Sequence, residues 1–353
     1  MMRYKHIVES EKIKVAIVGC GRISKNHFES IEIFKNDLRL VALCDVDTAI
    51  LDKFTNEYKV PGYLDLEEMF AIESIDLVIL CTPSGLHAQQ TILAAEYKIN
   101  VMTEKPMATR WRDGIRMVQA CDKACVRLFV VKQNRYNATL QLLKRALTEK
   151  RFGRIHLVQV NVFWNRPQSY YDQGSGWRGT WEFDGGAFMN QASHYVDLLD
   201  WLIGPVERLQ AMTSTTREIE VEDTGVLNIK WRNGALGSMS VTMLTYPKNL
   251  EGSITILGEK GTVKIGGVAV NEIKEWAFED RMDYDLSISA ANYDTTSVYG
   301  VGHPIYYQNV IQVMRGQEEP VTDGREGLKS LELIIAAYMS SKDGKTISIP
   351  LEF

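Results

Sequence analysis

The sequence predicts an α/β protein of two domains, the first with a doubly wound parallel sheet and the second with an open, mostly antiparallel sheet. The chain has 353 residues, which is long for a single hydrophobic core. Up to about residue 131, short apolar runs alternate with helical stretches, and beyond it several strand-like runs follow one another directly. We therefore expect domains over 1–131 and 132–353.

The first domain shows a regular order of strand and helix. The predicted strands are KVAIVGC, LRLVALCD, IDLVILCTP, INVMTEKP and RLFVVKQ. The predicted helices cover about 24–34 and 48–58 and the runs HAQQTILAAEYK and WRDGIRMVQACDKA. Continuous apolar strands are typical of a parallel sheet that helices cover on both faces. The alternation implies right-handed crossovers and a twisted sheet.

The second domain is predicted to begin with a helix over about 138–149 and to end with one over about 323–342. Between them lie the alternating runs IHLVQVNVFW, VERLQAMTSTT, TGVLNIKW, GALGSMSVTML and EGSITILGEKGTVKI. Turn signals such as RNG and GEKG separate several of these runs. The pattern indicates an antiparallel meander in one large sheet.

Composition and charge exclude several classes of protein. The net charge is -5 and basic residues are scattered, which argues against nucleic acid or a membrane surface as the main partner. No stretch approaches the roughly 20 apolar residues of a membrane span, and the charged N-terminus is unlike a signal peptide. We expect a cytoplasmic protein.

The cysteines and histidines indicate no metal site. The 5 cysteines all lie within the first 125 residues, several of them in apolar strands, and we interpret them as reduced thiols packed in the interior. The 6 histidines show no paired ligand spacing.

A glycine motif follows the first strand and opens a helix, reading Gly19-x-Gly21-x-x-Ser24. The first glycine permits the tight turn, and the second lets the backbone approach a pyrophosphate at the helix N-terminus. Asp45 ends the second strand, where a carboxylate accepts hydrogen bonds from a ribose diol and repels a 2′-phosphate. The sequence therefore predicts a Rossmann domain that binds NAD rather than NADP, although Arg22 would suit NADP.

The run CTPSGLH follows another strand, and ligands bind outside the carboxyl ends of such strands. Thr82 and Ser84 can donate to phosphate or ribose. His87 is expected to begin the next helix and to pack near the cofactor, and a catalytic role is the alternative.

The run EKP places Glu104 and Lys105 at the end of a buried strand. A charge there costs several kcal/mol unless a partner compensates it. Pro106 favours extended geometry at Lys105 and could support a cis bond, which fixes where the ammonium points. Such a lysine can donate to a substrate hydroxyl, and a surface salt bridge is the alternative.

The run WEFDGGAFMNQASHYVDLLDWLIG combines a flexible approach, Asp184-Gly185-Gly186, with a predicted helix. Asn190 and His194 would lie one turn apart on one face of that helix. An imidazole can take a hydroxyl proton while hydride leaves the carbon. A packed or capping histidine is the alternative.

These four motifs, in this order, strongly resemble the Gfo/Idh/MocA oxidoreductases over essentially the whole chain. The resemblance implies that Lys105 and His194 meet across an interdomain cleft beside the nicotinamide. Many members carry Asp where this chain has Asn190, so either His194 or Lys105 could be the general base. The cofactor-binding residues it implies are Gly19, Gly21, Arg22, Ile23, Asp45, Thr82, Pro83, Ser84, His87, Glu104, Lys105, Trp177 and Arg178.

Longer runs resemble the WlbA-type dehydrogenases within that family, among them VGCGRISKNHF, TEKPMATRW and GTWEFDGGAFMNQASHYVDLLDW. These enzymes oxidise C3 of UDP-2-acetamido-2-deoxy-glucuronic acid to the 3-keto sugar, on the route to diacetamido uronic acids of bacterial surface polysaccharides such as lipopolysaccharide O-antigen. The resemblance also implies a homotetramer, and it leaves open whether NADH is released or reoxidised in place by a keto acid such as 2-oxoglutarate.

Arginine suits a uronate carboxylate and a diphosphate better than lysine does. The predicted substrate-binding residues are Lys105, Gln133, Arg135, Asn137, Arg166, Asn190 and His194, with Asn134 and Arg178 as further candidates. A solvated loop or a hydrogen bond at the sheet edge is the alternative for each polar residue. The aromatic run FWNRPQSYYDQGSGW is either part of the site or a subunit contact.

Two other functions compete with this interpretation. A dehydrogenase of another nucleotide sugar, or of a free sugar or polyol such as inositol, would share the fold and the lysine–histidine pair. A regulator that binds NAD without catalysis would be expected to have lost Lys105 or His194, and both are present.

Overall fold

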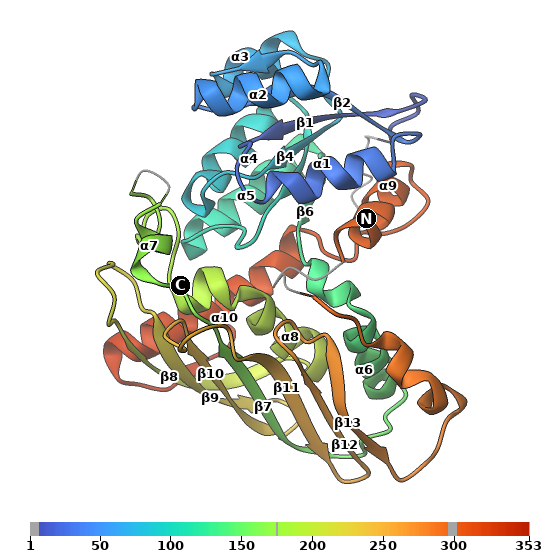
Figure 1. Cartoon of the computed structure of the whole chain (residues 1–353), viewed down its shortest axis with the longest axis vertical. Coiled ribbons are helices and arrows are strands. Elements are labelled where there is room, and N and C mark those ends of the chain that lie inside the picture. Colours follow the sequence, from blue (N-terminus) through green and yellow to red (C-terminus); the bar gives the residue numbers. More distant parts are fainter. Residues whose placement is uncertain (1–6, 174–175, 296–301, 353) are drawn as a thin grey trace. The chain divides into compact units, whose positions relative to one another are not determined.

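The computed structural model describes residues 7–173, 176–295 and 302–352, which fall into two compact units (Figure 1). The first unit comprises the residues up to Lys132 together with His303–Leu331, and the second comprises Gln133–Gly302 and the residues from Glu332 onward. The sequence prediction assigned 132–353 to one domain, whereas His303–Leu331 returns to the first unit. The reason is helix α9 (His303–Met314), which packs against helix α1 (Ser24–Ile33).

A six-stranded sheet with all neighbours parallel forms the centre of the first unit. In spatial order its strands are β3 (Gly62–Tyr63), β2 (Leu38–Cys44), β1 (Ile13–Val18), β4 (Leu77–Leu80), β5 (Asn100–Thr103) and β6 (Leu128–Val130). The chain order reverses between β1 and β4, and this is the point where such sheets bind nucleotides. The doubly wound parallel sheet is therefore confirmed.

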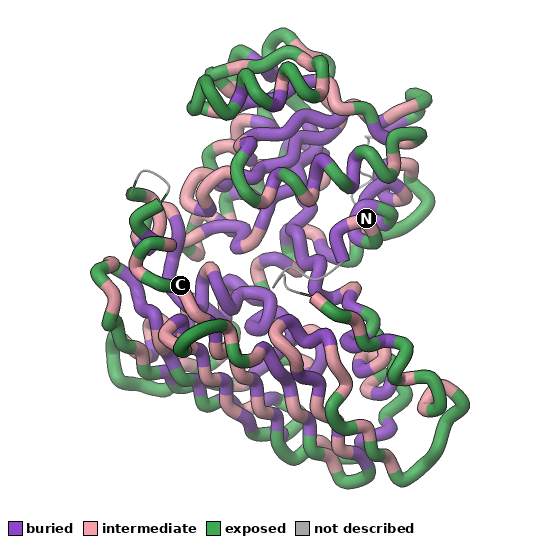
Figure 2. Tube along the Cα trace, in the orientation of Figure 1, coloured by how far each residue is buried: buried purple, intermediate pink, exposed green. Residues whose placement is uncertain are grey.

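Strands β1, β4, β5 and β6 are buried almost completely because they are apolar on both faces, whereas the edge strand β3 and the first half of β2 are partly exposed (Figure 2). The flanking helices are α1, α2 (Thr48–Tyr58), α3 (Leu66–Ile72), α4 (His87–Glu96) and α5 (Trp111–Ala124). Two of them begin at an aspartate: the Asp47 carboxylate accepts hydrogen bonds from the first turn of α2, and Asp65 does so for α3.

The second unit contains an eight-stranded sheet in which only β7 and β10 pair in parallel. In spatial order its strands are β13 (Glu272–Phe278), β12 (Gly261–Gly266), β11 (Glu251–Gly258), β7 (Ile155–Phe163), β10 (Leu236–Thr242), β9 (Thr224–Trp231), β8 (Val206–Ser214) and β14 (Ile347–Ser348). The open, mostly antiparallel sheet is confirmed.

Burial alternates along the central strands of the second sheet (Figure 2). In β7, Val158, Val160 and Val162 are fully buried, whereas Gln159 and Asn161 are half-buried. One face of the sheet is therefore core and the other is open. The remaining helices are α6 (Ala138–Thr148), α7 (Gln168–Tyr171), α8 (Ser193–Ile203) and α10 (Gly324–Asp343), and α6 packs against α8.

Within the described residues, no helix combines the length and the apolar character that crossing a bilayer would require.

Candidate active site

In the first unit, the predicted cofactor-binding residues lie at the carboxyl ends of neighbouring parallel strands. Gly19 follows β1, Asp45 follows β2, Thr82 follows β4 and Glu104 follows β5. Because carboxyl ends of parallel strands share one edge of a sheet, the structure brings these residues to the same edge.

The glycine loop has the geometry that a bound pyrophosphate needs. Gly19 has a φ of 88°, and a Cβ there would lie 2.8 Å from the carbonyl carbon of Cys81, so only glycine fits. A Cβ built on Gly21 would meet no atom within 4 Å, which leaves room for a ligand beside the backbone. The Ser24 hydroxyl donates to the Gly21 carbonyl at 2.7 Å and fixes the loop to the first turn of α1. The residues present fit a dinucleotide.

The Asp45 carboxylate is oriented by two backbone N–H groups. Its Oδ2 accepts from Cys20 at 2.6 Å, within the glycine loop, and its Oδ1 accepts from Asp47 at 2.9 Å. Each oxygen retains a second lone pair, so the carboxylate can still accept from a ribose diol. Arg22, which is exposed, and Ile23, which is half-buried, lie directly before α1.

His87 joins two of the strand-end loops. Its ring nitrogens lie 3.0 Å from the carbonyl oxygens of Thr82 and Pro106, and the side chain is fully buried. Burial lowers its pKa, which favours the neutral ring. The Thr82 hydroxyl donates to Gln90 at 2.6 Å, beside half-buried Pro83 and buried Ser84. The geometry gives His87 a role in holding the loops together.

Glu104 has the partner that its buried position requires. Its Oε1 lies 3.1 Å from Nε2 of His27 on α1, and its Oε2 accepts the backbone N–H of Lys105 at 3.1 Å. Burial alone would raise the pKa of Glu104, but the imidazoles of His27 and His303 hold it well below its usual range. The peptide bond between Lys105 and Pro106 is cis. Sequence reasoning missed His27 because it lies 77 positions from Glu104.

In the second unit, the segment that carries Asn190 differs from the prediction. Asn190 and His194 were expected one turn apart on one helix, but Asn190 lies in a π-helical turn, Ala187–Gln191, and His194 lies in the first turn of α8. The two segments are separated at Ala192, which has a φ of −101° and a ψ of 7°. Single π-helical turns are frequent at functional sites.

Glu222, which the sequence analysis did not single out, accepts a hydrogen bond from the backbone of the π-helical turn. Glu222 Oε1 accepts from the Phe188 N–H at 2.8 Å and from the Tyr338 hydroxyl at 3.0 Å. A Cβ on Gly186 would lie 1.8 Å from Glu222 Oε2, so a side chain there would collide with the carboxylate. Burial raises the pKa of Glu222 to about 7.

Asn190 contacts a carboxylate that sequence reasoning treated only as part of a turn. Its amide donates to Asp184 Oδ1, while Asp184 Oδ2 accepts from the Gly179 N–H at 2.7 Å. Asp184 is buried, and these contacts fix the position of the Asn190 side chain. The Asp-Gly-Gly motif was the signal for Asp184.

His194 and Asp197, one turn apart on α8, are both engaged by the segment that opens the second unit. Gln133 Nε2 donates to His194 Nε2 at 3.0 Å, which places the ring proton on Nδ1. Arg135 forms a bidentate ion pair with Asp197, with both contacts at 2.7 Å and both side chains 3 % exposed. Asn137 is fully buried and donates to the Ala269 carbonyl at 3.4 Å. These contacts of Arg135 and Asn137 are therefore with other residues of the second unit.

Arg166 and Arg178, both predicted from the sequence, meet at Tyr170. The Arg178 guanidinium donates to the Tyr170 hydroxyl at 2.9 Å, and the Arg166 guanidinium lies 5.5 Å from the Tyr170 ring centre. Gln191 accepts from Arg166 at 2.9 Å and donates to Tyr170 at 3.1 Å. The Trp177 ring lies 4.4 Å from the Arg178 guanidinium carbon. Through Tyr170 and Gln191, both guanidinium groups are linked to the residue that follows Asn190 in the chain. Gly174 and Ser175 of the aromatic run lie outside the described residues.

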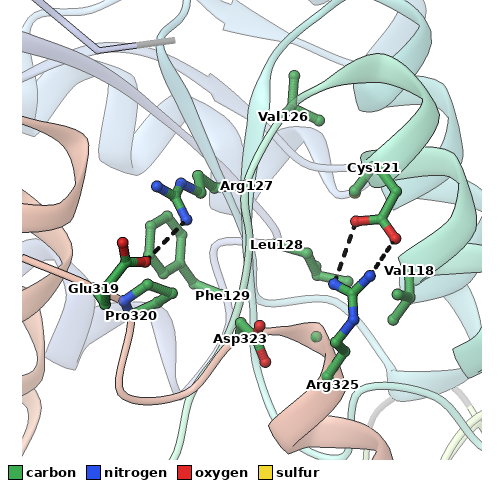
Figure 3. Close-up of a pocket in the computed structure, with 12 residues that line it drawn as sticks. Val118, Cys121, Val126, Arg127, Leu128, Phe129, Glu319, Pro320, Asp323 and Arg325 are labelled. Carbon is green, nitrogen blue, oxygen red and sulfur yellow. Dashed lines mark hydrogen bonds and ion pairs between the residues drawn. The ribbon is translucent and has the colours of Figure 1, made fainter. Parts of the chain in front are cut away.

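A separate shallow pocket of about 100 Å³ lies beside the amino-terminal end of β6, away from the strand ends described above (Figure 3). Arg325 pairs with Asp122 at 2.6 Å on one side of it, and Arg127 lies 3.8 Å from Glu319 on the other. Both of its arginines are already paired with carboxylates, and it is lined by none of the predicted site residues.

Comparisons with known proteins agree with the fold and the motifs. Residues 13–132 match the NAD-binding Rossmann-fold model of the Gfo/Idh/MocA oxidoreductase family, and residues 144–349 match its C-terminal alpha/beta domain model. The chain is 26% identical to D-apiose dehydrogenase of Paraburkholderia graminis, covering 96% of this chain and 90% of that protein.

Two solved structures are much more similar. The WlbA dehydrogenase of Chromobacterium violaceum, in complex with NADH and UDP-GlcNAcA, is 61% identical with a TM-score of 0.95 and covers 100% of both chains. The WlbA dehydrogenase of Bordetella pertussis, in complex with the same two molecules, is 56% identical with a TM-score of 0.93, covering 98% of this chain and 100% of that one. The chain belongs to the Gfo/Idh/MocA family of NAD-binding oxidoreductases.

Proposed function

We propose that this protein oxidises the C3 hydroxyl of UDP-2-acetamido-2-deoxy-D-glucuronic acid to the 3-keto sugar with NAD as oxidant. The observation that carries the proposal is the 61% and 56% identity, over essentially the whole chain, to two WlbA dehydrogenases whose structures contain NADH and UDP-GlcNAcA. Relatives with the same fold at lower identity act on other sugars and polyols, so the fold alone would not select this substrate.

The residues proposed for the chemistry are Lys105 of the first unit and His194 and Asn190 of the second. Bound NAD would accept a hydride from C3, and the hydroxyl proton would pass to Lys105 or to His194. Lys105 lies two residues after the end of β5, and its backbone N–H donates to the Glu104 carboxylate. His194 is held with its proton on Nδ1 by Gln133, so a substrate hydroxyl that displaced the Gln133 amide would meet the basic Nε2. Asn190, fixed by Asp184, would orient a sugar hydroxyl.

The arginines around Tyr170 fit the anionic part of this substrate. Arg166 and Arg178 are both half-buried, and Nε of Arg178 is a buried donor with no hydrogen-bond partner among the described residues. A carboxylate or a diphosphate would satisfy such donors with charge-assisted hydrogen bonds. A neutral polyol would leave the same donors without an anionic acceptor.

The open face of the second sheet supports self-association, and we propose a homotetramer. Leu157, Leu236 and Leu257 are 43%, 54% and 36% exposed and lie side by side on β7, β10 and β11. An exposed apolar row across three strands is typical of a protein interface.

The proposed product would serve the synthesis of bacterial surface polysaccharide, such as O-antigen, in the cytoplasm.

Product analysis tests the proposed reaction. Purified protein is incubated with NAD and UDP-2-acetamido-2-deoxy-glucuronic acid, and the product is trapped with borodeuteride so that mass spectrometry and NMR locate the deuterium. We expect deuterium at C3, whereas deuterium at another carbon, or none, would refute the assignment. Because NADH could stay bound after purification, 2-oxoglutarate is added in a parallel reaction to reoxidise it.

Myo-inositol serves as the substrate for the competing function, since the chain is also 24% identical to a myo-inositol 2-dehydrogenase of Thermotoga maritima over 96% of its length. Turnover of inositol beside a silent nucleotide sugar would favour a polyol dehydrogenase. We expect the reverse. Replacement of Lys105 by Met should lower kcat at least about 100-fold in either case, because the variant loses a proton-transfer group at the reacting hydroxyl.

A further inference from the structure

A buried cluster in the first unit brings together residues that are far apart in the sequence. His27 lies on α1, Glu104 follows β5, and His303 and Tyr307 lie one turn apart on α9. All four residues are at most 4 % exposed. Two of the four, His303 and Tyr307, come from His303–Leu331, the segment that belongs to the first unit although it follows most of the second unit in the sequence.

The hydrogen bonds in the cluster form a chain with a single consistent direction. Burial raises the pKa of the Tyr307 phenol well above its usual range, so its hydroxyl keeps a proton and donates to His27 Nδ1 at 2.7 Å. His27 then carries its own proton on Nε2 and donates to Glu104 Oε1 at 3.1 Å. Burial lowers the pKa of His27, which agrees with this neutral form. The other carboxylate oxygen accepts the backbone N–H of Lys105 at 3.1 Å.

His303 contributes a weaker contact to the same carboxylate. Its Nε2 lies 3.5 Å from Glu104 Oε1, and its Nδ1 lies 3.5 Å from the side-chain amide of Asn26. The rings of His27 and His303 meet edge to face, with centres 5.5 Å apart. The 3.5 Å separation makes this an electrostatic contact, so His27 is the principal donor to Glu104.

The same cluster touches the two parts of the cofactor-binding edge. His27 lies in the first turn of α1, directly after the glycine loop, and Glu104 lies directly before Lys105. A displacement of His27 would therefore move Glu104, and with it the backbone at Lys105. We propose that Tyr307, His27 and Glu104 are positioning residues that hold Lys105 in register with the glycine loop, an inference that rests on the proposed role of Lys105 in the reaction.

The geometry of the three ligating groups could also be interpreted as a metal site, since atoms of His27, Glu104 and His303 lie within 4.8 Å of one another. Hydrogen bonding explains the arrangement without an ion, because His27 Nε2 faces Glu104 at a normal hydrogen-bond distance and Tyr307 occupies the other ring nitrogen. Metal analysis of the purified protein is therefore part of the test.

The kinetic test uses Tyr307→Phe, which removes one oxygen atom at the end of the chain farthest from Lys105. We expect kcat to fall about 10-fold because the reacting groups are misplaced, while KM for both substrates stays within about 2-fold. Tyr63→Phe is the matched control: it removes a phenol that donates to Glu73 at 2.6 Å elsewhere in the first unit, and it should leave kcat unchanged.

A double variant separates positioning from general destabilisation. If Tyr307 acts through Glu104, then Tyr307→Phe should lower kcat much less in a Glu104→Gln background than in the wild-type protein. Equal fold-losses in the two backgrounds, or an unchanged kcat in Tyr307→Phe, would overturn the proposal. Should Glu104→Gln fail to fold, His27→Leu provides the background, since it interrupts the chain at its middle.

A second readout does not depend on the substrate. Amide hydrogen exchange is measured by mass spectrometry for the peptide spanning Met102–Ala108, which contains the Lys105 amide. We expect Tyr307→Phe to speed exchange in this peptide and Tyr63→Phe to leave it as in the wild-type protein. Unchanged exchange in Tyr307→Phe would refute the inference even if the proposed substrate proved wrong.

The outcomes are distinguishable from those of the proposed function. Wild-type protein that does not turn over UDP-2-acetamido-2-deoxy-glucuronic acid contradicts the proposed function, and the exchange experiment still decides the inference. Wild-type turnover with an unaffected Tyr307→Phe variant contradicts the inference alone. Stoichiometric zinc in the wild-type protein that is absent from Glu104→Gln would also overturn it, because the cluster would then be a metal site.

Discussion

Two buried carboxyl groups, Glu104 and Glu222, differ in charge state because their hydrogen-bond partners differ. Glu104 is buried, yet its pKa lies well below its usual range because imidazoles face it. Glu222 is equally buried, but its Oε1 accepts from a backbone N–H and a phenol, neither of which is cationic, and burial raises its pKa to about 7. Glu104 is therefore an anion near neutral pH, where Glu222 changes its charge.

The raised pKa of Glu222 gives the protein a stability that depends on pH. The folded state binds this proton more tightly than the unfolded state does, so the contribution is fully present below the unfolded pKa and is lost as pH rises through about 7. Glu222→Gln, which is neutral at every pH, should gain stability relative to the wild-type protein between about pH 5 and pH 8 by roughly 3 kcal/mol. Denaturant unfolding at both pH values measures it, and a difference that does not vary with pH would contradict the assignment.

Asp45 is predicted to select the cofactor. Asp45→Ser should raise KM for NAD by about 10- to 100-fold, because hydrogen bonds to a charged group contribute about 1.5–3 kcal/mol, and it should improve turnover with NADP. Asp47→Ser serves as the control, since serine can still cap α2 two residues farther along. Steady-state kinetics with both cofactors decide the matter, and an unchanged preference would exclude Asp45 from the ribose site.

At the residue scale, motifs pointed to candidate cofactor-binding groups, and they missed the residues that hold those groups in place. Gly19, Asp45 and Lys105 were recognisable because each follows a strand within a short motif. His27 and Glu222 were not recognisable, because their partners Glu104 and Phe188 lie far away in the sequence and only tertiary packing brings them together. No local pattern encodes such a contact.

At the scale of elements, the prediction of one continuous helix through Ala187–Gln191 was wrong. The sequence Asp184-Gly185-Gly186 and the apolar residues after it predicted one helix, and the structure has a π-helical turn followed by α8. The Phe188 N–H donates to Glu222, which lies in the loop before β9, and this contact between residues 34 positions apart fixes the beginning of the segment. Helical periodicity does not report such a competing acceptor.

Gly186 should be intolerant of any side chain for the same reason. Gly186→Ala would place a Cβ 1.8 Å from Glu222 Oε2, so the turn or the carboxylate must shift, at a cost of about 1–3 kcal/mol. We expect a lower melting temperature and a lower kcat, since Asn190 and His194 follow directly. Gly266→Ala is the matched control, because its Cβ would meet only the flexible side chain of Lys274, at 3.1 Å. Equal effects of the two variants would contradict this explanation.

At the scale of the whole molecule, fold class and sheet type followed from the order of strands and helices, but the extent of the first unit did not. Helix α9 belongs to that unit through contacts with α1, made by residues near the opposite end of the sequence. A sequence read from one end to the other gives no sign of that return. The open sheet, in contrast, was foreseeable, because its strands alternate between apolar and polar residues.

The exposed row on that sheet gives a prediction about assembly. Leu157→Arg, at the centre of the row, should lower the mass measured by light scattering from a tetramer toward a smaller species, because a buried unpaired charge opposes association. Its effect on monomer stability should be within about 0.5 kcal/mol, as for other surface substitutions. Ile33→Arg, at a residue 61% exposed on the first unit, is the control. An unchanged mass would place the subunit contact elsewhere.

The central claim is that the protein is a dehydrogenase of a nucleotide-linked uronic acid, and one comparison tests it most directly. The measurement is kcat/KM for UDP-2-acetamido-2-deoxy-glucuronic acid against UDP-N-acetylglucosamine, which differs only in carrying a C6 hydroxymethyl group in place of the carboxylate. Charge-assisted hydrogen bonds from arginine to the carboxylate predict a preference of about 10- to 100-fold for the acid. Equal values, or a preference for UDP-N-acetylglucosamine, would contradict the account.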